Sequence, residues 1–174
     1  MTTDLPLYER DPAAYRAYLA EGNEHQARKR VSADLLVRDA AGRILIVDPG
    51  YKPGWDLPGG MAEANEPPLA AVRREIREEL GLDTEPQRVL CIDWVPPHDP
   101  WDDLLAFIFD GGVLTQDQIG SLRTADGELE AFEFCTADQV RERLRPRAWR
   151  RTAAALEALE TGWARYLQDG YPVA

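Results

Sequence analysis

The stretch from residue 66 to residue 80 constrains the fold more than any other part of the chain. Its aliphatic residues fall within one narrow stripe of a helical wheel drawn at about 100° per residue, namely Leu69, Val72, Ile76 and Leu80. Pro67 suits the first helical turn, where no intrahelical N–H bond is lost, and Asn65 or Glu66 can cap it. Gly81 stands where a left-handed residue commonly ends a helix. The pattern therefore predicts a helix that packs on a core along one face.

Runs rich in branched residues predict strands on both sides of this helix. The runs at 31–37 and 44–47 enclose a glycine-containing turn and are typical of a hairpin. The other expected elements are strands at 88–95, 103–109 and 130–135, helices at 11–28, 137–144 and 147–168, and loops at 111–112 and 116–128. The chain therefore mixes helices with strands that mostly form hairpins, and one helix crosses between them.

The charge of the chain limits its partners. The net charge is -11 over 174 residues, whereas proteins that bind duplex nucleic acid usually show a basic face. No apolar run approaches the roughly 20 residues that a membrane helix needs, and the charged N-terminus lacks the apolar core of a signal peptide. We therefore expect one domain of a cytoplasmic protein that binds neither duplex nucleic acid nor a membrane.

Neither the cysteines nor the histidines indicate a metal site. Cys91 and Cys135 lie in apolar segments, and no CxxC or Cys/His spacing suggests zinc. We expect two buried free thiols, because free cysteine is usually buried. His25 and His98 stand in polar or proline-rich surroundings and are expected at the surface.

Three glutamates of the helix at 66–80 fall together on one flank of the wheel. They are Glu75, Glu78 and Glu79, and such like-charged neighbours cost a helix roughly 0.2–0.5 kcal/mol each. One interpretation is a solvated acidic face. The other is a site for Mg²⁺, which takes hard oxygen ligands, beside a glycine-rich loop that lets the backbone approach a diphosphate. Bound cations would also reconcile an acidic chain with an anionic substrate.

The same region matches a known signature at every specified position. Gly60, Glu66 and the run from Arg74 to Leu82 spell the Nudix box, GX5EX7REUXEEXGU. Seven fixed positions match by chance with a probability on the order of 10⁻⁸ per start site. The chain therefore resembles the Nudix hydrolases. The resemblance implies an α/β/α sandwich with a mixed β-sheet, in one domain over 1–174 that adds an N-terminal helical extension at 1–28 and a C-terminal helix at 147–168.

The resemblance also implies an enzyme and assigns roles to residues of the box. Nudix hydrolases cut the diphosphate bond of nucleotide-type small molecules with Mg²⁺ or Mn²⁺. The metal ligands of the family fall here on Glu78 and Glu79, and on the carbonyl of Gly59. Arg74 corresponds to the arginine that orients the glutamates, and Glu75 to a residue that binds metal in some members and acts as the base in others.

Many members add a carboxylate from a later loop. Alignment on the motif at 134–136 places it at Glu128, with Glu130 and Glu133 as rivals, and an ordinary surface glutamate is the competing interpretation. Glu128 is then a candidate metal ligand and catalytic residue. Two or three cations would neutralise the diphosphate oxygens, and Glu75 or Glu128 would take the proton of the attacking water.

Side chains outside the catalytic set would choose the substrate. The candidate contacts are Arg30, Tyr51, Lys52, Trp55, Gly60, Trp94 and Trp101. For Arg30 a solvated surface charge is the competing interpretation. Trp94 and Trp101 can sandwich a base or can pack a homodimer interface. Pro97 lies at the same distance beyond the box as a proline of the ADP-ribose pyrophosphatases in the family, which favours ADP-ribose as the substrate. The other candidate substrates are nucleotide sugars, dinucleoside polyphosphates and ordinary or modified nucleoside triphosphates.

Three other functions compete with hydrolysis. A non-catalytic nucleotide-sensing domain on the same fold is the main alternative, although an intact box favours turnover. A diphosphate isomerase of this fold would want an active-site cysteine and metal-binding histidines, and neither His25 nor His98 has an evident ligand partner. A pure interaction module would leave the clustered glutamates without a role.

Overall fold

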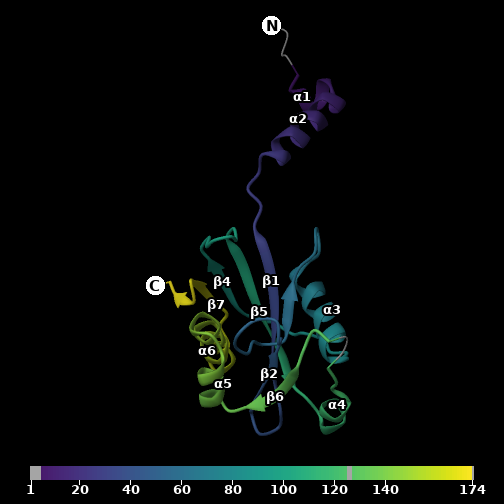
Figure 1. The fold of residues 1–174 in the computed structure, drawn as a ribbon. Coiled ribbons are helices and arrows are strands. Elements are labelled where there is room, and N and C mark those ends of the chain that lie inside the picture. Colours follow the sequence, from purple (N-terminus) through teal and green to yellow (C-terminus); the bar gives the residue numbers. More distant parts are fainter. Residues whose placement is uncertain (1–4, 125–126, 174) are drawn as a thin grey trace.

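A mixed β-sheet forms the centre of the computed structural model, which describes residues 5–124 and 127–173. The strands follow the order β6-β2-β1-β5-β4-β7-β8, and β3 pairs with β1 outside this path. Their bounds are β1 Arg30–Arg38, β2 Ile44–Asp48, β3 Gly59–Met61, β4 Val89–Val95, β5 Leu104–Val113, β6 Ala131–Cys135, β7 Arg165–Gln168 and β8 Tyr171–Pro172. The helices are α1 Leu7–Arg10, α2 Pro12–Glu24, α3 Pro68–Leu80, α4 Gln116–Ser121, α5 Ala137–Arg143 and α6 Pro146–Thr161. Helices α3 and α4 cover one face of the sheet, and α5 and α6 cover the other (Figure 1).

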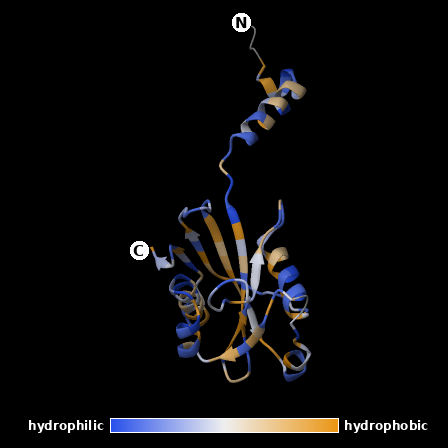
Figure 2. Ribbon diagram, in the orientation of Figure 1, coloured by the Kyte–Doolittle hydropathy of each residue, from blue (hydrophilic) through white to orange (hydrophobic). Residues whose placement is uncertain are grey.

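Alternating side chains of β1 build two separate core layers. Leu35 belongs to the core layer that contains Ile76 of α3, whereas its neighbour Leu36 belongs to the layer that contains Ala155 of α6. Successive residues of a strand point to opposite faces, so β1 is buried on both sides. In Figure 2 the central strands are largely hydrophobic, whereas the helices carry both hydrophilic and hydrophobic residues. The expected α/β/α sandwich with a mixed sheet and the buried stripe of α3 are confirmed.

Strand β1 has different partners along its length. It pairs with β2 at Arg38↔Ile44 and with β3 from Ser32↔Met61 to Asp34↔Gly59, both antiparallel. Along its other edge it runs parallel to β5, and β4 runs parallel to β7. These parallel pairs are not hairpins, because parallel strands need a crossover connection, and α3 lies in the connection from β1 to β5.

Two segments expected to be loops are regular elements. Within the expected loop at 116–128, residues 116–121 form α4, because Thr115 and Gln118 make a reciprocal capping box. The glycines at 111–112 belong to β5. A Cβ added at Gly111 would lie 2.6 Å from a side-chain carbon of Val37, so this glycine allows β5 to pack closely on β1.

Two helix ends differ from the prediction. Helix α6 ends before Gly162, which has a φ of 80°, and residues 165–168 form β7 instead of continuing a helix to 168. At the start of α3, Pro67 occupies the cap position without a side-chain hydrogen bond, so neither Asn65 nor Glu66 is the cap. The carboxylate of Glu66 bonds to Arg74 instead.

The N-terminal helices project from the body of the protein (Figure 1). Asp11 caps α2 by accepting hydrogen bonds from the N–H groups of Ala13 and Ala14, as expected, but α2 ends at Glu24 and not at 28. Neither α1 nor α2 contains a buried residue. These helices therefore contribute no side chain to either core layer.

The expectations for single cysteines and histidines are confirmed. Cys91 and Cys135 are buried free thiols, and His25 and His98 are exposed. Within residues 5–124 and 127–173, no helix combines the length and the apolar character that crossing a membrane requires.

Candidate functional site

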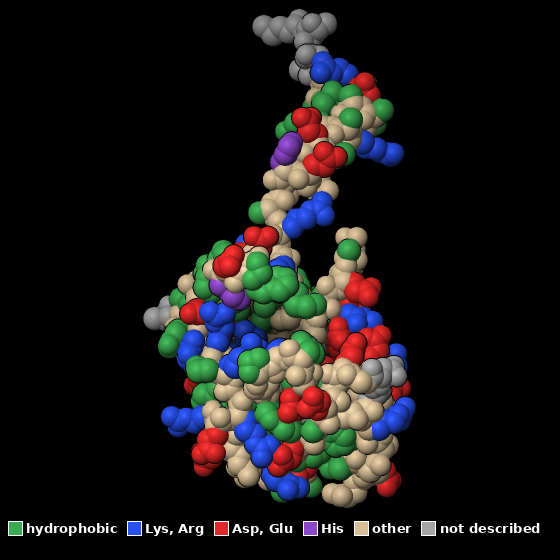
Figure 3. All heavy atoms as spheres, viewed as in Figure 1, with side chains coloured by type: hydrophobic (Ala, Val, Ile, Leu, Met, Phe, Trp, Pro, Cys, Tyr) green, Lys and Arg blue, Asp and Glu red, His purple; other side chains and the backbone are tan. Residues whose placement is uncertain are grey.

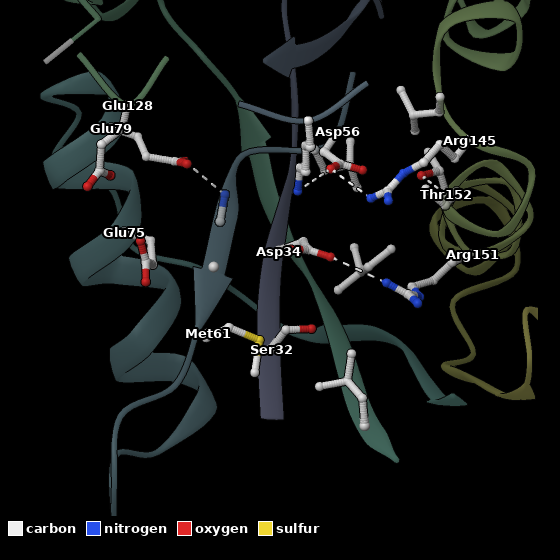
Figure 4. A pocket seen from close by; sticks show the side chains of 18 of the residues that line it. Ser32, Asp34, Asp56, Met61, Glu75, Glu79, Glu128, Arg145, Arg151 and Thr152 are labelled. Carbon is white, nitrogen blue, oxygen red and sulfur yellow. Dashed lines mark hydrogen bonds and ion pairs between the residues drawn. The ribbon is translucent and has the colours of Figure 1, made fainter. Parts of the chain in front are cut away.

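A cavity of about 490 Å³ lies between α3 and α6, with β1 and β3 as its floor (Figure 4). This volume is within the roughly 300–1,000 Å³ of small-molecule sites. Two charged walls face each other across it. The acidic wall holds Glu75, Glu79 and Glu128, and the basic wall holds Lys52, Arg145 and Arg151. Figure 3 shows this division at the surface, where Lys and Arg side chains border the hollow on one side and Asp and Glu side chains on the other.

Two adjacent glycines bring the acidic wall against the backbone of β3. Gly59 has a φ of 141°, and an added Cβ there would collide with the carbonyl oxygen of Ala33 in β1. An added Cβ at Gly60 would collide with the carboxylate of Glu75. Side chains at these positions would therefore push β3 away from β1 or Glu75 away from the cavity.

Arg74 is the centre of an ion-pair network on α3. Its Nε and Nη2 donate to Glu66 across 3.1 and 2.9 Å, and its Nη1 donates to Glu75 and Glu78 across 2.9 and 3.1 Å. Nη2 also donates to the carbonyl of Met61, which ties α3 to β3. The hydrogen bonds from Arg74 lower the pKa of Glu66. This geometry suits the orienting role predicted for Arg74, whereas Glu78, predicted as a metal ligand, is exposed and does not line the cavity.

Glu79 lies deepest in the acidic wall. The backbone N–H of Gly59 donates to its carboxylate across 3.0 Å. Burial nevertheless raises the pKa of Glu79 to about 8, and the negative charges of Glu75, Asp34 and Glu128 add to the effect. Burial likewise raises the pKa of Glu75, against the opposing hydrogen bond from Arg74. Full ionisation of the acidic wall would therefore place more negative charge there than its protein surroundings neutralise.

The donor set of the acidic wall fits a hard divalent cation. Carboxylate oxygens are the ligands that Mg²⁺ and Mn²⁺ prefer, and a cation would neutralise the surplus charge of Glu75, Glu79 and Glu128. Within the two described ranges, no three His, Cys, Asp or Glu side chains form a ready-made metal site. The side chains thus offer part of a coordination sphere, and Mg²⁺ usually completes its sphere with water and phosphate oxygens.

The basic wall is organised by carboxylates behind and between its cations. Asp56 lies 2.7 Å from Nζ of Lys52 and 3.3 Å from a guanidinium nitrogen of Arg145. Arg151 lies 3.1 Å from the buried Asp93 and 3.7 Å from Asp34 on the cavity floor. The Gly170 N–H also donates to Asp93, across 2.9 Å. Burial raises the pKa of Asp34 to about 7, although the charge of Arg151 opposes this shift.

The residues predicted to contact substrate divide into two groups. Arg30, Tyr51, Lys52 and Gly60 line the cavity, as does the predicted metal-ligand position Gly59. Trp55, Trp94 and Trp101 do not line it. The guanidinium of Arg143 lies over the ring of Trp55, and the guanidinium carbon of Arg30 lies 4.4 Å from the ring centroid of Trp101. The indole N–H of Trp94 donates to Asp103 across 2.8 Å. The structure does not bring Trp94 and Trp101 to the cavity, and both proposed roles of this pair remain predictions.

The later glutamates also separate. Glu128 lines the cavity from the segment before β6. Glu133 instead pairs with Arg143, and neither Glu130 nor Glu133 lines the cavity. Among the three candidates, Glu128 is the one that the fold brings to the acidic wall.

Sequence reasoning missed most of the basic wall. Arg145 and Arg151 come from α6 and its cap, and Asp34 and Asp56 come from β1 and the loop before β3. A weak signal was present, because six arginines occur between residues 141 and 151. That density hides which arginines face the cavity, since only the packing of α6 on the sheet selects them.

Comparison with known proteins identifies similar domains. Residues 28–157 match the family model described as NUDIX domain. The chain is 27% identical to the phosphatase NudJ of Escherichia coli K12 over 104 residues. This aligned region covers 58% of this chain and 65% of that protein. It is 42% identical over 53 residues to the RNA pyrophosphohydrolase of Halorhodospira halophila, which is 30% of this chain and 29% of that protein. The match thus spans less than two thirds of these curated relatives.

A solved structure supports the fold. The ADP-ribose pyrophosphatase of Streptococcus suis superimposes with a TM-score of 0.62 at 22% sequence identity, over 81% of this chain and 99% of that one. At this identity the likeness concerns the fold alone.

Proposed function

We propose, on the premise that the chain belongs to the NUDIX domain family, that it hydrolyses the diphosphate bond of a nucleotide-type small molecule with Mg²⁺ or Mn²⁺ as its cofactor. The observation that carries the proposal is the acidic wall, where Glu75 and Glu79 line a cavity beside the backbone of Gly59 and Gly60. ADP-ribose, a nucleotide sugar and an ordinary or modified nucleoside triphosphate are the candidate substrates.

Glu79 would hold the cation at the cavity, and Glu75 would either join it as a ligand or act as the base. The Gly59 N–H aims the carboxylate of Glu79, and Arg74 aims that of Glu75. A bound cation would neutralise diphosphate oxygens and lower the pKa of water. Because both carboxylates are anchored before substrate arrives, little reorganisation would be needed in the transition state.

Glu75 and Glu128 are the two candidates for the group that takes the proton of the attacking water. Glu75 is tied to Arg74, whereas Glu128 is exposed at the edge of the cavity. The variants Glu75→Gln and Glu128→Gln separate the two roles. Loss of the base should lower kcat by about 10²–10⁴-fold and leave metal affinity unchanged, whereas loss of a ligand should weaken metal binding.

The test is to incubate the purified protein with a panel of nucleotides and Mg²⁺ and to identify the products by mass. We expect products cut at a diphosphate bond, and a chelator should abolish the reaction. Water labelled with heavy oxygen would show which phosphorus is attacked. Absence of metal-dependent turnover across the panel would sink the proposal and favour the alternative, a nucleotide-sensing domain without catalysis.

We also propose that residues 1–174 form one cytoplasmic domain in which 1–28 is an extension. The support is that α1 and α2 contribute no buried residue, whereas α6 packs directly on the sheet that carries the site. A homodimer stays an open expectation, and sedimentation of the purified chain would test it.

A further inference from the structure

The cations of the basic wall are unevenly paired with the carboxylates beside them. Lys52 and Arg145 share a single partner, Asp56, at 2.7 and 3.3 Å. Arg151, in contrast, has two carboxylates within 4 Å. The Lys52–Arg145 pair therefore carries one positive charge more than Asp56 neutralises, in a chain whose net charge is -11.

The two cations of this pair disfavour each other. Burial and the charge of Arg145 both act to lower the pKa of Lys52, but the ion pair with Asp56 outweighs them and raises it. The side chains of Lys52 and Arg145 keep 33% and 54% of their surface exposed, so an incoming group can reach them. Lysine has three N–H donors and arginine has five, and Asp56 engages a fraction of them. An anion in the cavity would use the remaining donors and relieve the repulsion.

The first turn of α6 adds donors at the same place. This 16-residue helix begins at Pro146, and Arg145 caps it without a side-chain hydrogen bond. The first backbone hydrogen bond within the helix runs from the N–H of Trp149 to the carbonyl of Arg145. The N–H groups of Arg147 and Ala148 come before it and have no acceptor within the helix. Of these two, Ala148 lines the cavity. A helix N-terminus carries a partial positive charge, which here reinforces that of the cation pair.

We propose that Lys52, Arg145 and the first turn of α6 bind a second anionic group of the substrate, a phosphate or carboxylate beyond the diphosphate that the acidic wall addresses. This inference rests on the proposed function, because it assigns the scissile diphosphate to the opposite wall. It predicts that the protein selects substrates with an additional charged group over those whose far end is neutral. The two walls lie on opposite sides of the cavity floor (Figure 4), so one substrate would have to span them.

The first test uses inorganic phosphate and the metal-free, chelator-treated protein, so that it does not depend on hydrolysis. Phosphate is titrated against the full-length chain and followed by NMR shifts of the Ala148 and Lys52 amides. We expect saturable binding that Lys52→Gln and Arg145→Gln each weaken about tenfold or more, as expected for loss of a charge-assisted hydrogen bond. Arg145→Lys, which keeps the charge, should recover part of the affinity.

Arg141→Gln is the matched control, because Arg141 is an exposed arginine of α5 that does not line the cavity. It removes the same charge and should leave phosphate binding unchanged. Circular dichroism melts confirm that each variant is folded. If Arg141→Gln weakened phosphate binding equally, the effect would come from the net charge of the protein and not from a site in the cavity. Unchanged phosphate binding in both cavity variants would overturn the proposal.

The second test compares substrates that differ by one anionic group. One pair is a nucleoside diphosphate and the matching triphosphate, and the other is ADP-ribose without and with an additional ribose phosphate. We expect kcat/KM to favour the member with the additional anionic group in one of the two pairs, which identifies where that group sits. Arg145→Gln should reduce this preference about tenfold. An equal loss for both members of each pair would refute a second anion subsite. If no substrate is hydrolysed but phosphate binding follows the first test, the proposed function fails and the subsite stands.

Discussion

The backbone N–H of Gly59 donates a hydrogen bond to the carboxylate of Glu79 across 3.0 Å, and this bond joins β3 to α3 at the cavity. It holds one carboxylate of the acidic wall in place while burial raises the pKa of that carboxylate to about 8. The site thus combines a fixed position with a carboxyl group whose ionisation a bound cation would favour. Four predictions follow from this arrangement and from the fold that supports it.

Glu79→Gln should lower kcat by about 100-fold or more and leave the protein folded, because glutamine keeps the shape and an oxygen acceptor for the Gly59 N–H but loses the charge that a cation needs. Steady-state kinetics and a thermal melt measure the two effects. Glu142→Gln, at an exposed position on α5, is the control and should match the wild-type protein. Wild-type rates in Glu79→Gln would refute the assignment.

Alanine at the two glycines of β3 should have different effects. Gly59→Ala places a Cβ against the backbone of Ala33 at a φ of 141°, so it should destabilise the fold by roughly 1–3 kcal/mol. Gly60→Ala meets the end of the Glu75 side chain, which can move, so it should reduce activity more than stability. Denaturant unfolding and kinetics distinguish the two.

The control for this pair is Gly120→Ala, since nothing lies within 4 Å of a Cβ added at Gly120. That variant should keep both activity and stability. If Gly59→Ala were as stable as Gly120→Ala, the close approach of β3 to β1 would not need a glycine.

Stability of the metal-free protein should depend on pH through Asp34. Its pKa rises from 3.8 to about 7 on folding, so between these values the folded state holds a proton that the unfolded chain has lost. The free energy of unfolding should therefore fall as pH rises from 4 to 7. Asn cannot ionise, so Asp34→Asn should not show this fall. The free energy of unfolding of the variant minus that of the wild-type protein should rise by up to about 3 kcal/mol from pH 5 to pH 8.

Urea unfolding at both pH values, with a chelator present, measures this difference. Asp138→Asn, at an exposed position of α5, supplies the matched change in charge and should show no such trend. A constant difference between Asp34→Asn and the wild-type protein would mean that Asp34 is ionised throughout the range.

Removal of residues 1–28 should leave the melting temperature and the activity unchanged, because α1 and α2 contain no buried residue and the chain from Lys29 keeps its ion pair with Asp103. Calorimetry and the nucleotide assay check this expectation. A large fall in melting temperature, or a change in sedimentation, would show that the N-terminal helices pack on a partner in solution.

Local patterns predicted the elements that depend on neighbouring residues. The stripe of α3 predicted its buried face, and the Nudix box placed Arg74 among the glutamates that it contacts. Strands β1, β2, β4, β5 and β6 were also located, because branched residues mark them, whereas β7 was predicted to be part of a helix. Helix α4 also has a local signal, the capping box of Thr115 and Gln118, but the polar composition of this stretch predicted a loop.

The sequence by itself determined that a helix with one apolar face carries clustered glutamates behind a glycine-rich loop, because helical periodicity and backbone freedom are properties of adjacent residues. Only the tertiary structure decided that Glu128 joins this wall, that Glu78 lies outside it, and that Lys52 and Arg145 meet across Asp56. Those contacts join residues of different strands, helices and loops. Antiparallel pairing of β2 with β6 and packing of α6 on the sheet bring them together, and neither is encoded in any single segment.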